Sequence, residues 1–264
     1  MRSSNLVIEL PSYFDYSIEE IQMGFMRLEG KVILVTGAGR GIGKAAVTLF
    51  AAEGGRVAFC ARSEGELFGV AKEIDGAEER LRPFRADISS RREVQRMVSQ
   101  VISEWGKIDI LINNAGVLGP SEPIATYPPE AWEEVIRINI NGTFLVTQAV
   151  VRTMIPRRSG TVLSVTSSVG RKGRATWGAY AVSKFGLEGM MQTLADEVGP
   201  FGLKVVTLNP GGTRTKMRAA AYPKEDPGKL QEPMEVAKAL SQLATSDDPT
   251  LHGKSLDLSD FTIR

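Results

Sequence analysis

The chain reads Lys31-Val32-Ile33-Leu34-Val35-Thr36-Gly37-Ala38-Gly39-Arg40-Gly41-Ile42-Gly43 close to its start. The first six residues form a mostly apolar run of strand length, which is typical of a strand buried on both faces. A helix is expected to follow over residues 44–53, so the glycines lie in a turn between strand and helix. Glycines let the backbone approach a pyrophosphate, and the helix N-terminus offers unpaired N–H groups. The stretch therefore predicts a nucleotide-binding turn, with a tight turn that binds no ligand as the alternative.

The next strand indicates which dinucleotide this turn would bind. Residues 56–60 are predicted to form that strand, which ends at Ala61-Arg62-Ser63. In the NAD-binding version of such a unit, an acidic residue near this strand end bonds the ribose 2′-hydroxyl. The sequence has no acidic residue here, and Arg62 together with Arg40 would suit a 2′-phosphate. We therefore expect NADP(H) to be preferred over NAD(H), unless Arg62 is simply solvated.

Strand and helix patterns alternate along the rest of the chain. Strands are expected at residues 81–86, 108–113, 160–168, 203–208 and 254–258, and helices at 66–74, 91–105, 128–154, 180–198 and 233–244. This alternation predicts an α/β fold: one Rossmann domain over residues 30–264, with a doubly wound, mostly parallel sheet of about seven strands and helices on both faces. Residues 216–231 are polar and contain two prolines, so we expect a lid or mobile loop there.

Two segments depart from this pattern. Residues 1–29 lie outside it; Ser17 to Leu28 could form a short amphipathic helix. The segment is either an arm that packs on the domain or a neighbouring subunit, or an extension upstream of a natural start at Met26. The other departure is in the middle of helix 128–154, where Asn139 and Gly142 weaken the segment. A local kink and a role in the site are both open.

Composition excludes several classes of protein. The 264 residues carry a net charge of +1, which gives no electrostatic case for nucleic acid or an anionic membrane. One cysteine, Cys60, rules out an internal disulfide, and one histidine, His252, leaves a Ser-His-Asp hydrolase a single candidate. We expect no metal site. No apolar run approaches the roughly 20 residues of a membrane span, and the start does not read as a signal peptide, so a cytoplasmic location is expected.

A tyrosine and a lysine stand four residues apart in the helix that begins near residue 180. Tyr180 and Lys184 would lie one above the other on the same face. A phenol has a pKa near 10, and a neighbouring ammonium lowers that pKa toward neutrality. The pair is therefore a candidate general acid and base. The alternative is a half-buried tyrosine beside a lysine that packs along its stem.

Five separated motifs now share one order along the chain, and together they resemble the short-chain dehydrogenase/reductase family in its single-domain NAD(P)-dependent form. The resemblance covers the chain from about Leu28 to Leu258. Within the family, the chain is similar to 3-oxoacyl-[acyl-carrier-protein] reductases. The chain departs from the family after its last strand, where Asp257-Leu258-Ser259-Asp260 replaces a common Gly-Gly pair. The motifs are Thr36–Gly43, Asn113–Gly116, Asn139, Ser167 with Tyr180 and Lys184, and Pro210-Gly211 with Thr215.

The resemblance implies a role for each catalytic residue. Tyr180 would donate the proton in reduction and accept it in oxidation, while Lys184 would lower the pKa of Tyr180 and hold the nicotinamide ribose. Ser167, which precedes Tyr180 by the family's spacing of 13 residues, would bond the substrate carbonyl. Asn139 would hold the water of a proton relay. The implied reaction is hydride transfer between the nicotinamide and a ketone or secondary alcohol, without a metal.

The resemblance also implies the cofactor contacts. Asp87 would meet the adenine and Asn114 the adenosine-side ribose, while Thr213 and Thr215 would meet the nicotinamide carboxamide. The expected cofactor-binding residues are therefore Gly37, Gly39, Arg40, Gly41, Ile42, Gly43, Arg62, Asp87, Ile88, Asn114, Ala115, Gly116, Tyr180, Lys184, Pro210, Gly211, Thr213 and Thr215.

The substrate and the assembly are less closely defined. We hypothesise an anionic substrate or carrier met by cations at the mouth of the site, with a solvated rim as the alternative; Trp177 could wall the pocket. The function is predicted as a carbonyl reductase or alcohol dehydrogenase, with 3-oxoacyl-carrier-protein reductase and a non-catalytic NADP(H)-sensing protein as alternatives. A homodimer or homotetramer is expected, through the helices that contain Asn139 and Tyr180. The cations are Arg171, Lys172, Arg174, Arg214, Lys216 and Arg218.

Overall fold

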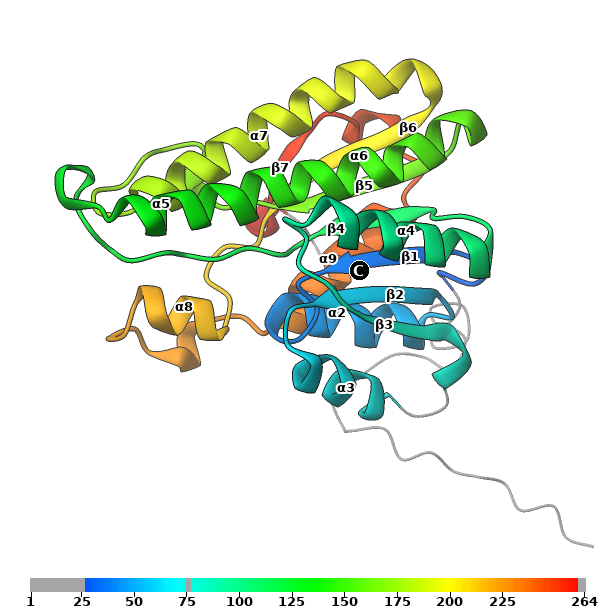
Figure 1. The fold of residues 1–264 in the computed structure, drawn as a ribbon, viewed down its shortest axis with the longest axis horizontal. Coiled ribbons are helices and arrows are strands. Elements are labelled where there is room, and N and C mark those ends of the chain that lie inside the picture. Colours follow the sequence, from blue (N-terminus) through cyan, green and yellow to red (C-terminus); the bar gives the residue numbers. More distant parts are fainter. Residues whose placement is uncertain (1–26, 75–76, 261–264) are drawn as a thin grey trace, which may run out of the picture.

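The computed structural model describes residues 27–74 and 77–260, and within them seven strands form one sheet. Every pair of neighbouring strands is parallel, in the order β3-β2-β1-β4-β5-β6-β7 (Figure 1). The predicted doubly wound sheet is confirmed. The strands are β1 (Val32–Thr36), β2 (Arg56–Ala61), β3 (Leu81–Arg85), β4 (Ile110–Asn113), β5 (Gly160–Val165), β6 (Leu203–Asn209) and β7 (Ser255–Asp257).

The central strands are apolar because helices cover both faces of the sheet. All five residues of β1 and all four of β4 are buried. The edge strand β3 is only partly buried and carries Pro83, a residue that sheets tolerate at an edge. Hydrophobic burial is therefore concentrated in the middle of the sheet, directly behind the glycine-rich turn.

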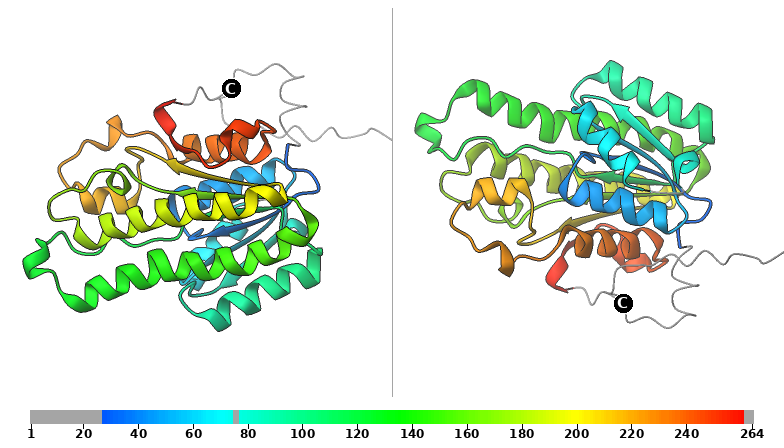
Figure 2. Two further views of the ribbon diagram at one scale, coloured as in Figure 1. Left: turned by 90° about the horizontal axis from the view of Figure 1, so that it is seen from above. Right: turned by 90° about the horizontal axis from the view of Figure 1, so that it is seen from below.

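Helices cover both faces of the sheet, as the two views of Figure 2 show. Phe50, Phe59 and Leu240 belong to the core on one side of the sheet, and Met97, Leu111 and Met154 to the core on the other. One face is covered by α2 (Gly41–Ala52), α3 (Glu64–Lys72) and α9 (Pro233–Thr245), the other by α4 (Arg91–Trp105), α6 (Thr143–Met154) and α7 (Gly178–Val198).

The long helix expected over residues 128–154 is confirmed as one continuous helical run, with a change of helix type in its middle. It comprises α5 (Pro129–Ile136), a π-helical segment (Arg137–Gly142) and α6. Asn139 lies inside the π-helical segment, where it is 3% exposed. The weak helix formers in the sequence therefore mark a local change of helical pitch. Short π-helical segments of this kind often occur at functional sites.

The segment 216–231 is also more ordered than expected. It contains α8 (Lys216–Ala221), whose N-cap Thr215 accepts a hydrogen bond from the Arg218 N–H, and a 3-10 helix (Pro227–Lys229). Helix α8 stands apart from both helical layers at one end of the molecule (Figure 1). It lies where the parallel strands end, which is the edge where open α/β sheets bind ligands.

The predictions for the N-terminal segment fall largely on residues 1–26, which lie outside the described residues. Leu28 is fully buried in the core beside α2, and its N–H donates to the Glu53 carbonyl. In the part of the chain that the structure describes, none of the helices has the length and apolarity that a membrane crossing requires.

Candidate active site

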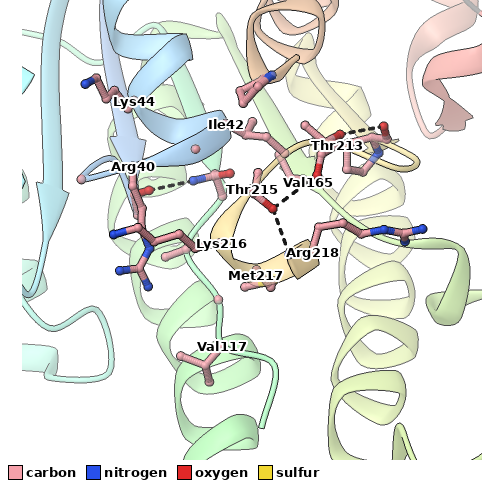
Figure 3. Close-up of a pocket in the computed structure, with 18 of the residues that line it drawn as sticks. Arg40, Ile42, Lys44, Val117, Val165, Thr213, Thr215, Lys216, Met217 and Arg218 are labelled. Carbon is pink, nitrogen blue, oxygen red and sulfur yellow. Dashed lines mark hydrogen bonds between the residues drawn. The ribbon is translucent and has the colours of Figure 1, made fainter. Parts of the chain in front are cut away.

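A long cleft of about 1180 Å³ runs along the carboxyl ends of the strands. Its wall is built by the turn after β1, the ends of β2, β4, β5 and β6, the start of α7, and α8 (Figure 3). Gly43 and Asn139 do not line it. The predicted residues that do are Gly37, Gly39, Arg40, Gly41, Ile42, Arg62, Asp87, Ile88, Asn114, Ala115, Gly116, Ser167, Tyr180, Lys184, Pro210, Gly211, Thr213 and Thr215.

The glycine-rich turn is packed directly against the loop that follows β4. Gly37 has φ +66°, and a Cβ there would lie 2.6 Å from the Cα of Ala115. A Cβ on Gly43 would lie 2.4 Å from the carbonyl oxygen of Gly37 and 2.5 Å from the Asn114 amide nitrogen. Gly43 thus belongs to the scaffold of the turn rather than to the cleft wall. Glycine is required at both positions because backbone occupies the space of a side chain.

Hydrogen bonds fix this contact. The Asn114 side-chain amide donates to the carbonyls of Thr36 and Gly37, at 3.0 Å each. The Thr36 hydroxyl accepts from the N–H groups of Asn114 and Ala115, at 3.1 Å each. Asn114 therefore holds the turn in place; it also lines the cleft, and its contact with the cofactor stays a prediction.

Two arginines lie at the end of the cleft where a 2′-phosphate was predicted. Arg40 pairs with Glu66 at 3.0 Å, and Arg62 pairs with Glu134 at 3.4 Å. Both arginine side chains are more than half exposed, so these ion pairs are weak and exchangeable. Arg40 and Lys216 of α8 both line the cleft (Figure 3). Glu66 was not predicted, because nothing in its local sequence distinguishes it from a solvated residue in the first turn of a helix.

Asp87 stands at the predicted adenine end. Burial opposes its ionisation, but hydrogen bonds from Ser89 and Arg137 together outweigh burial and lower the pKa of Asp87. The Ser89 N–H and hydroxyl donate at 2.9 and 2.7 Å, and Arg137 donates at 3.4 Å. The carboxylate is therefore ionised at neutral pH, with its hydrogen bonds in place beside the cleft.

Tyr180 and Lys184 lie on α7, and Ser167 is at the end of β5. Tyr180 and Lys184 are 8% and 7% exposed. Tyr180 and Ser167 are joined by a side-chain hydrogen bond. The Lys184 Nζ donates to the Val165 carbonyl at 2.8 Å and lies 5.7 Å from the centroid of the Tyr180 ring. The structure thus brings together all three residues that the motif spacing proposed.

The ionisation of this group differs from the sequence-based expectation. Burial raises the pKa of Tyr180 to about 12, the Ser167 hydrogen bond opposes that rise, and Tyr222 adds to it. Burial likewise lowers the pKa of Lys184 to about 8, against the attraction of Glu188. The pKa of Tyr180 is therefore raised in this arrangement, and not lowered as the spacing predicted. Burial dominates both groups because it disfavours each charged form.

Asn139 makes three hydrogen bonds beneath the cleft. Its amide nitrogen donates to the Val117 carbonyl and to the Ser183 hydroxyl, both at 2.9 Å, and its oxygen accepts from the Val117 N–H at 2.8 Å. Asn139 therefore clamps the loop after β4 to α7 through Ser183. Its role in holding a relay water stays a prediction.

Aromatic rings cover the space next to Tyr180. Trp177 stacks edge-on with Tyr180 at 5.8 Å and lies 5.5 Å from Tyr222, which caps the C-terminus of α8. Arg174 donates to the Tyr222 hydroxyl, and the Arg218 guanidinium lies 3.8 Å from the centroid of the same ring. The predicted wall residue Trp177 is in place. Tyr222 was missed because no periodic pattern marks a residue in a segment treated as a loop.

The cations expected at the mouth of the site have carboxylate partners in several cases. Arg171 bonds Asp257 at 2.7 Å, Arg218 bonds Glu225 at 2.6 Å, and Arg214 pairs with Glu232. An acidic partner offsets each of these charges, which reduces the pull that the rim exerts on an anion.

The single histidine lies away from this group. His252 contacts the Ala195 carbonyl at 3.1 Å and accepts from the Val205 N–H at 3.4 Å. Val205 is near the start of β6, whereas the cleft lies at its end. His252 therefore cannot complete a triad with Ser167. Among the residues described, no group of three or more His, Cys, Asp or Glu side chains could hold a metal ion.

Fold and site together define a class. A parallel sheet, a glycine turn at the start of a helix, and a serine beside a buried tyrosine and lysine near the strand ends are the parts of a dinucleotide-binding oxidoreductase. The sequence model of the short chain dehydrogenase family matches residues 31–226, and the chain belongs to this family. It is an oxidoreductase of the short-chain dehydrogenase/reductase type.

Individual relatives cover nearly the whole domain. The oxidoreductase YciK of Escherichia coli K12 is 39% identical over 87% of this chain and 92% of its own. The 3-oxoacyl-[acyl-carrier-protein] reductase FabG of Thermotoga maritima is 35% identical over 88% of this chain and 98% of its own. A crystal structure of a short chain dehydrogenase from Shigella flexneri in complex with NADP has a TM-score of 0.84 and 39% identity, covering 89% of this chain and 99% of its own.

Proposed function

We propose that the protein is an NADP(H)-dependent oxidoreductase that interconverts a ketone and a secondary alcohol, with Tyr180 as the proton donor and acceptor. The observation that carries the proposal is the buried group at the strand ends. Tyr180 is hydrogen-bonded to Ser167 and stands beside Lys184 in a cleft long enough for a dinucleotide. A sensing protein would not need this combination of hydroxyl, phenol and ammonium.

The residues of the cleft fit a dinucleotide phosphate. The turn at Gly37 leaves no room for a Cβ, so its backbone can approach a pyrophosphate closely, next to the N-terminus of α2. Arg40 and Arg62 would hold a 2′-phosphate, and Asp87 would accept from the adenine. When bound, the nicotinamide supplies or takes up the hydride. The Shigella flexneri relative was crystallised with NADP, which supports the choice of the phosphorylated form.

The protein's own part of the reaction is positioning and proton transfer. In reduction, the hydroxyls of Ser167 and Tyr180 would donate hydrogen bonds to the substrate oxygen, and the phenol proton would pass to that oxygen as it becomes a hydroxyl. Burial keeps Tyr180 in its protonated donor form at neutral pH. Lys184 would stabilise the phenolate left behind, because an opposite charge nearby favours the ionised form. In oxidation the same proton returns to Tyr180.

The substrate side carries apolar and aromatic side chains in addition to the cations of the rim. Trp177 and Tyr222 face the space next to Tyr180, and Leu118 packs on the same cluster. These contacts favour a carbonyl that carries an apolar group. The FabG relatives support a second candidate, reduction of a 3-oxoacyl group on a carrier protein. A panel of free and carrier-bound ketones would separate the two.

A homo-oligomer is also part of the proposal. Phe144 of α6 and Val182 and Phe185 of α7 are 44%, 46% and 46% exposed. Exposed apolar side chains on two neighbouring helices favour burial against a second copy. Light scattering on Phe185→Asp would show a smaller assembly than the native chain.

The decisive experiment is Tyr180→Phe. Removing a general acid typically costs 10²–10⁴-fold in turnover, so we expect a loss of about a thousandfold. NADPH fluorescence titration should give a nearly native Kd, because the ring remains. The control is Tyr127→Phe, which removes a buried hydroxyl away from the cleft. Full activity of Tyr180→Phe would overturn the mechanism, and native protein without turnover on any carbonyl would favour a sensing role.

A further inference from the structure

Glu188 is a buried acid that the mechanism above does not use. It lies on α7 four residues after Lys184 and is 6% exposed. Buried carboxylates are uncommon unless they are paired or hydrogen-bonded, so its position requires an explanation. One turn of helix separates it from Lys184, which places both side chains on the same face.

Hydroxyl groups from two strands hold this carboxylate. The Thr207 hydroxyl of β6 donates to Oε2 of Glu188 at 2.9 Å, and the Ser255 hydroxyl of β7 lies 2.9 Å from each of its oxygens. A carboxyl group whose oxygens accept hydrogen bonds from hydroxyl groups behaves as the ionised carboxylate, which is an acceptor only. Glu188 is therefore a fixed negative charge inside the fold.

Arg171 connects the same carboxylate to a second one. Its Nε lies 3.8 Å from Oε1 of Glu188, while its Nη1 donates to Asp257 at 2.7 Å and its Nη2 to Ser255 at 2.8 Å. One cation between two carboxylates leaves a net negative charge beneath α7. Arg171, expected at the mouth of the site as a substrate contact, is exposed and directs its guanidinium to these two carboxylates.

The charged neighbours of Lys184 can be named from each side. Tyr180 lies one turn before it on α7, Glu188 lies one turn after it, and the Val165 carbonyl of β5 accepts a hydrogen bond from its Nζ. Arg171 and Asp257 stand beyond Glu188, and Tyr222 faces Tyr180. Burial lowers the pKa of Lys184 and Glu188 opposes that effect, so the nearest negative charge acts in the direction that the geometry implies.

We propose that Glu188 is a positioning residue that keeps Lys184 protonated from inside the fold, with Arg171 setting how much of its charge Lys184 feels. The consequence for catalysis rests on the proposed function, since only a protonated Lys184 would stabilise the Tyr180 phenolate. The charge relation between Lys184 and Glu188 does not depend on that function. The hydrogen-bonded network around Glu188 and the catalytic pair Tyr180 and Lys184 are thus connected through one turn of α7.

The test measures Lys184 directly in the free protein. Lysine is labelled with ¹³C at Cε, and the Lys184 signal is assigned by its absence in Lys184→Met. With Glu188→Gln, the titration midpoint should fall by about one pH unit, the lower end of the effect of a close opposite charge. Glu188→Asp should restore most of the native value. An unchanged midpoint in Glu188→Gln would overturn the proposal.

Two further variants separate charge from structure. Asp257→Asn removes the same charge from the same network but not beside Lys184, so its shift should be less than half that of Glu188→Gln. Arg171→Gln removes the offsetting cation and should raise the midpoint. It also keeps the proposal testable if Glu188→Gln does not fold, since a fall in Arg171→Gln would contradict it.

Activity then supplies the link to the proposed function. The pH at which turnover declines on the alkaline side should move with the Lys184 midpoint across these variants. If the midpoint shifts while Tyr180→Phe stays fully active, the proposed mechanism fails and the charge relation stands. If the midpoint stays fixed while Tyr180→Phe is inactive, the reverse holds.

Discussion

The two walls of the cleft are built in different ways. The wall formed by the turn after β1 and the loop after β4 is backbone against backbone, with Gly37 so close to Ala115 that no side chain fits between them. The wall formed by Trp177, Tyr222 and α8 is side chain against side chain, through two tilted rings in contact and an arginine. The first wall defines one geometry, whereas the second can accept different rings and charges without changing the fold.

This difference explains what each wall can do. A dinucleotide is the same molecule in every turnover, so a fixed backbone cradle serves it. A substrate pocket gains by variation, and short elements outside the core vary at little cost to stability. The segment that contains α8 is closed at its base by the Arg214 N–H, which donates to the Gln231 carbonyl at 2.9 Å, and it contacts the rest of the fold through Arg174, which donates to the Tyr222 hydroxyl.

The largest expected effect comes from placing a side chain in the backbone wall. Gly37→Ala forces a positive φ on alanine and drives its Cβ into Ala115. The conformation costs roughly 1–2 kcal/mol and the overpacking a further 1–3 kcal/mol. Urea denaturation should show this loss, and NADPH affinity should fall strongly. Gly173→Ala is the control, because nothing lies within 4 Å of its added Cβ; equal effects would contradict the comparison.

The second effect concerns the charged end of the backbone wall. Arg62→Gln removes a cation predicted to meet a 2′-phosphate, which should weaken NADPH binding about tenfold, or 1.4 kcal/mol, and leave NADH binding unchanged. Arg56→Gln is the matched control, since it removes an exposed arginine from the other end of β2. Fluorescence titration with both cofactors gives the ratio. An equal loss for NADPH and NADH would show that Arg62 does not choose between them.

The third effect belongs to the side-chain wall. Tyr222→Ala removes the ring that packs against Trp177 and should raise KM for apolar ketones several-fold, because buried apolar area is lost at about 25 cal/mol per Å². The Kd for NADPH should not change. Tyr222→Phe keeps the ring and loses only the Arg174 bond, so its KM should stay near native. A larger effect on cofactor than on substrate would break the division between the walls.

The residues of the backbone wall could be predicted from the sequence, whereas the contacts of the side-chain wall could not. Gly37 directly follows a buried strand and Gly43 lies in the first turn of the next helix, and that local context determines what they do. Tyr222 is placed by α8 packing against a loop some 45 residues earlier in the chain, a distance over which no periodic signal survives. Contacts between distant side chains depend on tertiary packing, which local pattern cannot supply.

Electrostatics inside the fold were equally hidden. The Tyr180–Lys184 spacing predicted a lowered tyrosine pKa, but burial of both groups decides the outcome in the opposite direction. Arg171 looked like a rim cation because it follows Ser167, yet it turns toward Asp257 on the last strand. Spacing gives the neighbours of a residue along a helix, and not the depth at which they lie.

The smallest expected effect tests how far the rigidity of the backbone wall extends. Gly69 lies inside α3, next to the predicted 2′-phosphate end, and an added Cβ would meet nothing within 4 Å. Alanine loses less conformational entropy than glycine on entering a helix, so Gly69→Ala should stabilise the protein by roughly 0.5–1 kcal/mol. Thermal unfolding would report a higher Tm, and NADPH affinity should stay native. A destabilised Gly69→Ala would mean that the close packing seen at Gly37 extends through α3, and the demand for glycine would then no longer be confined to the turn.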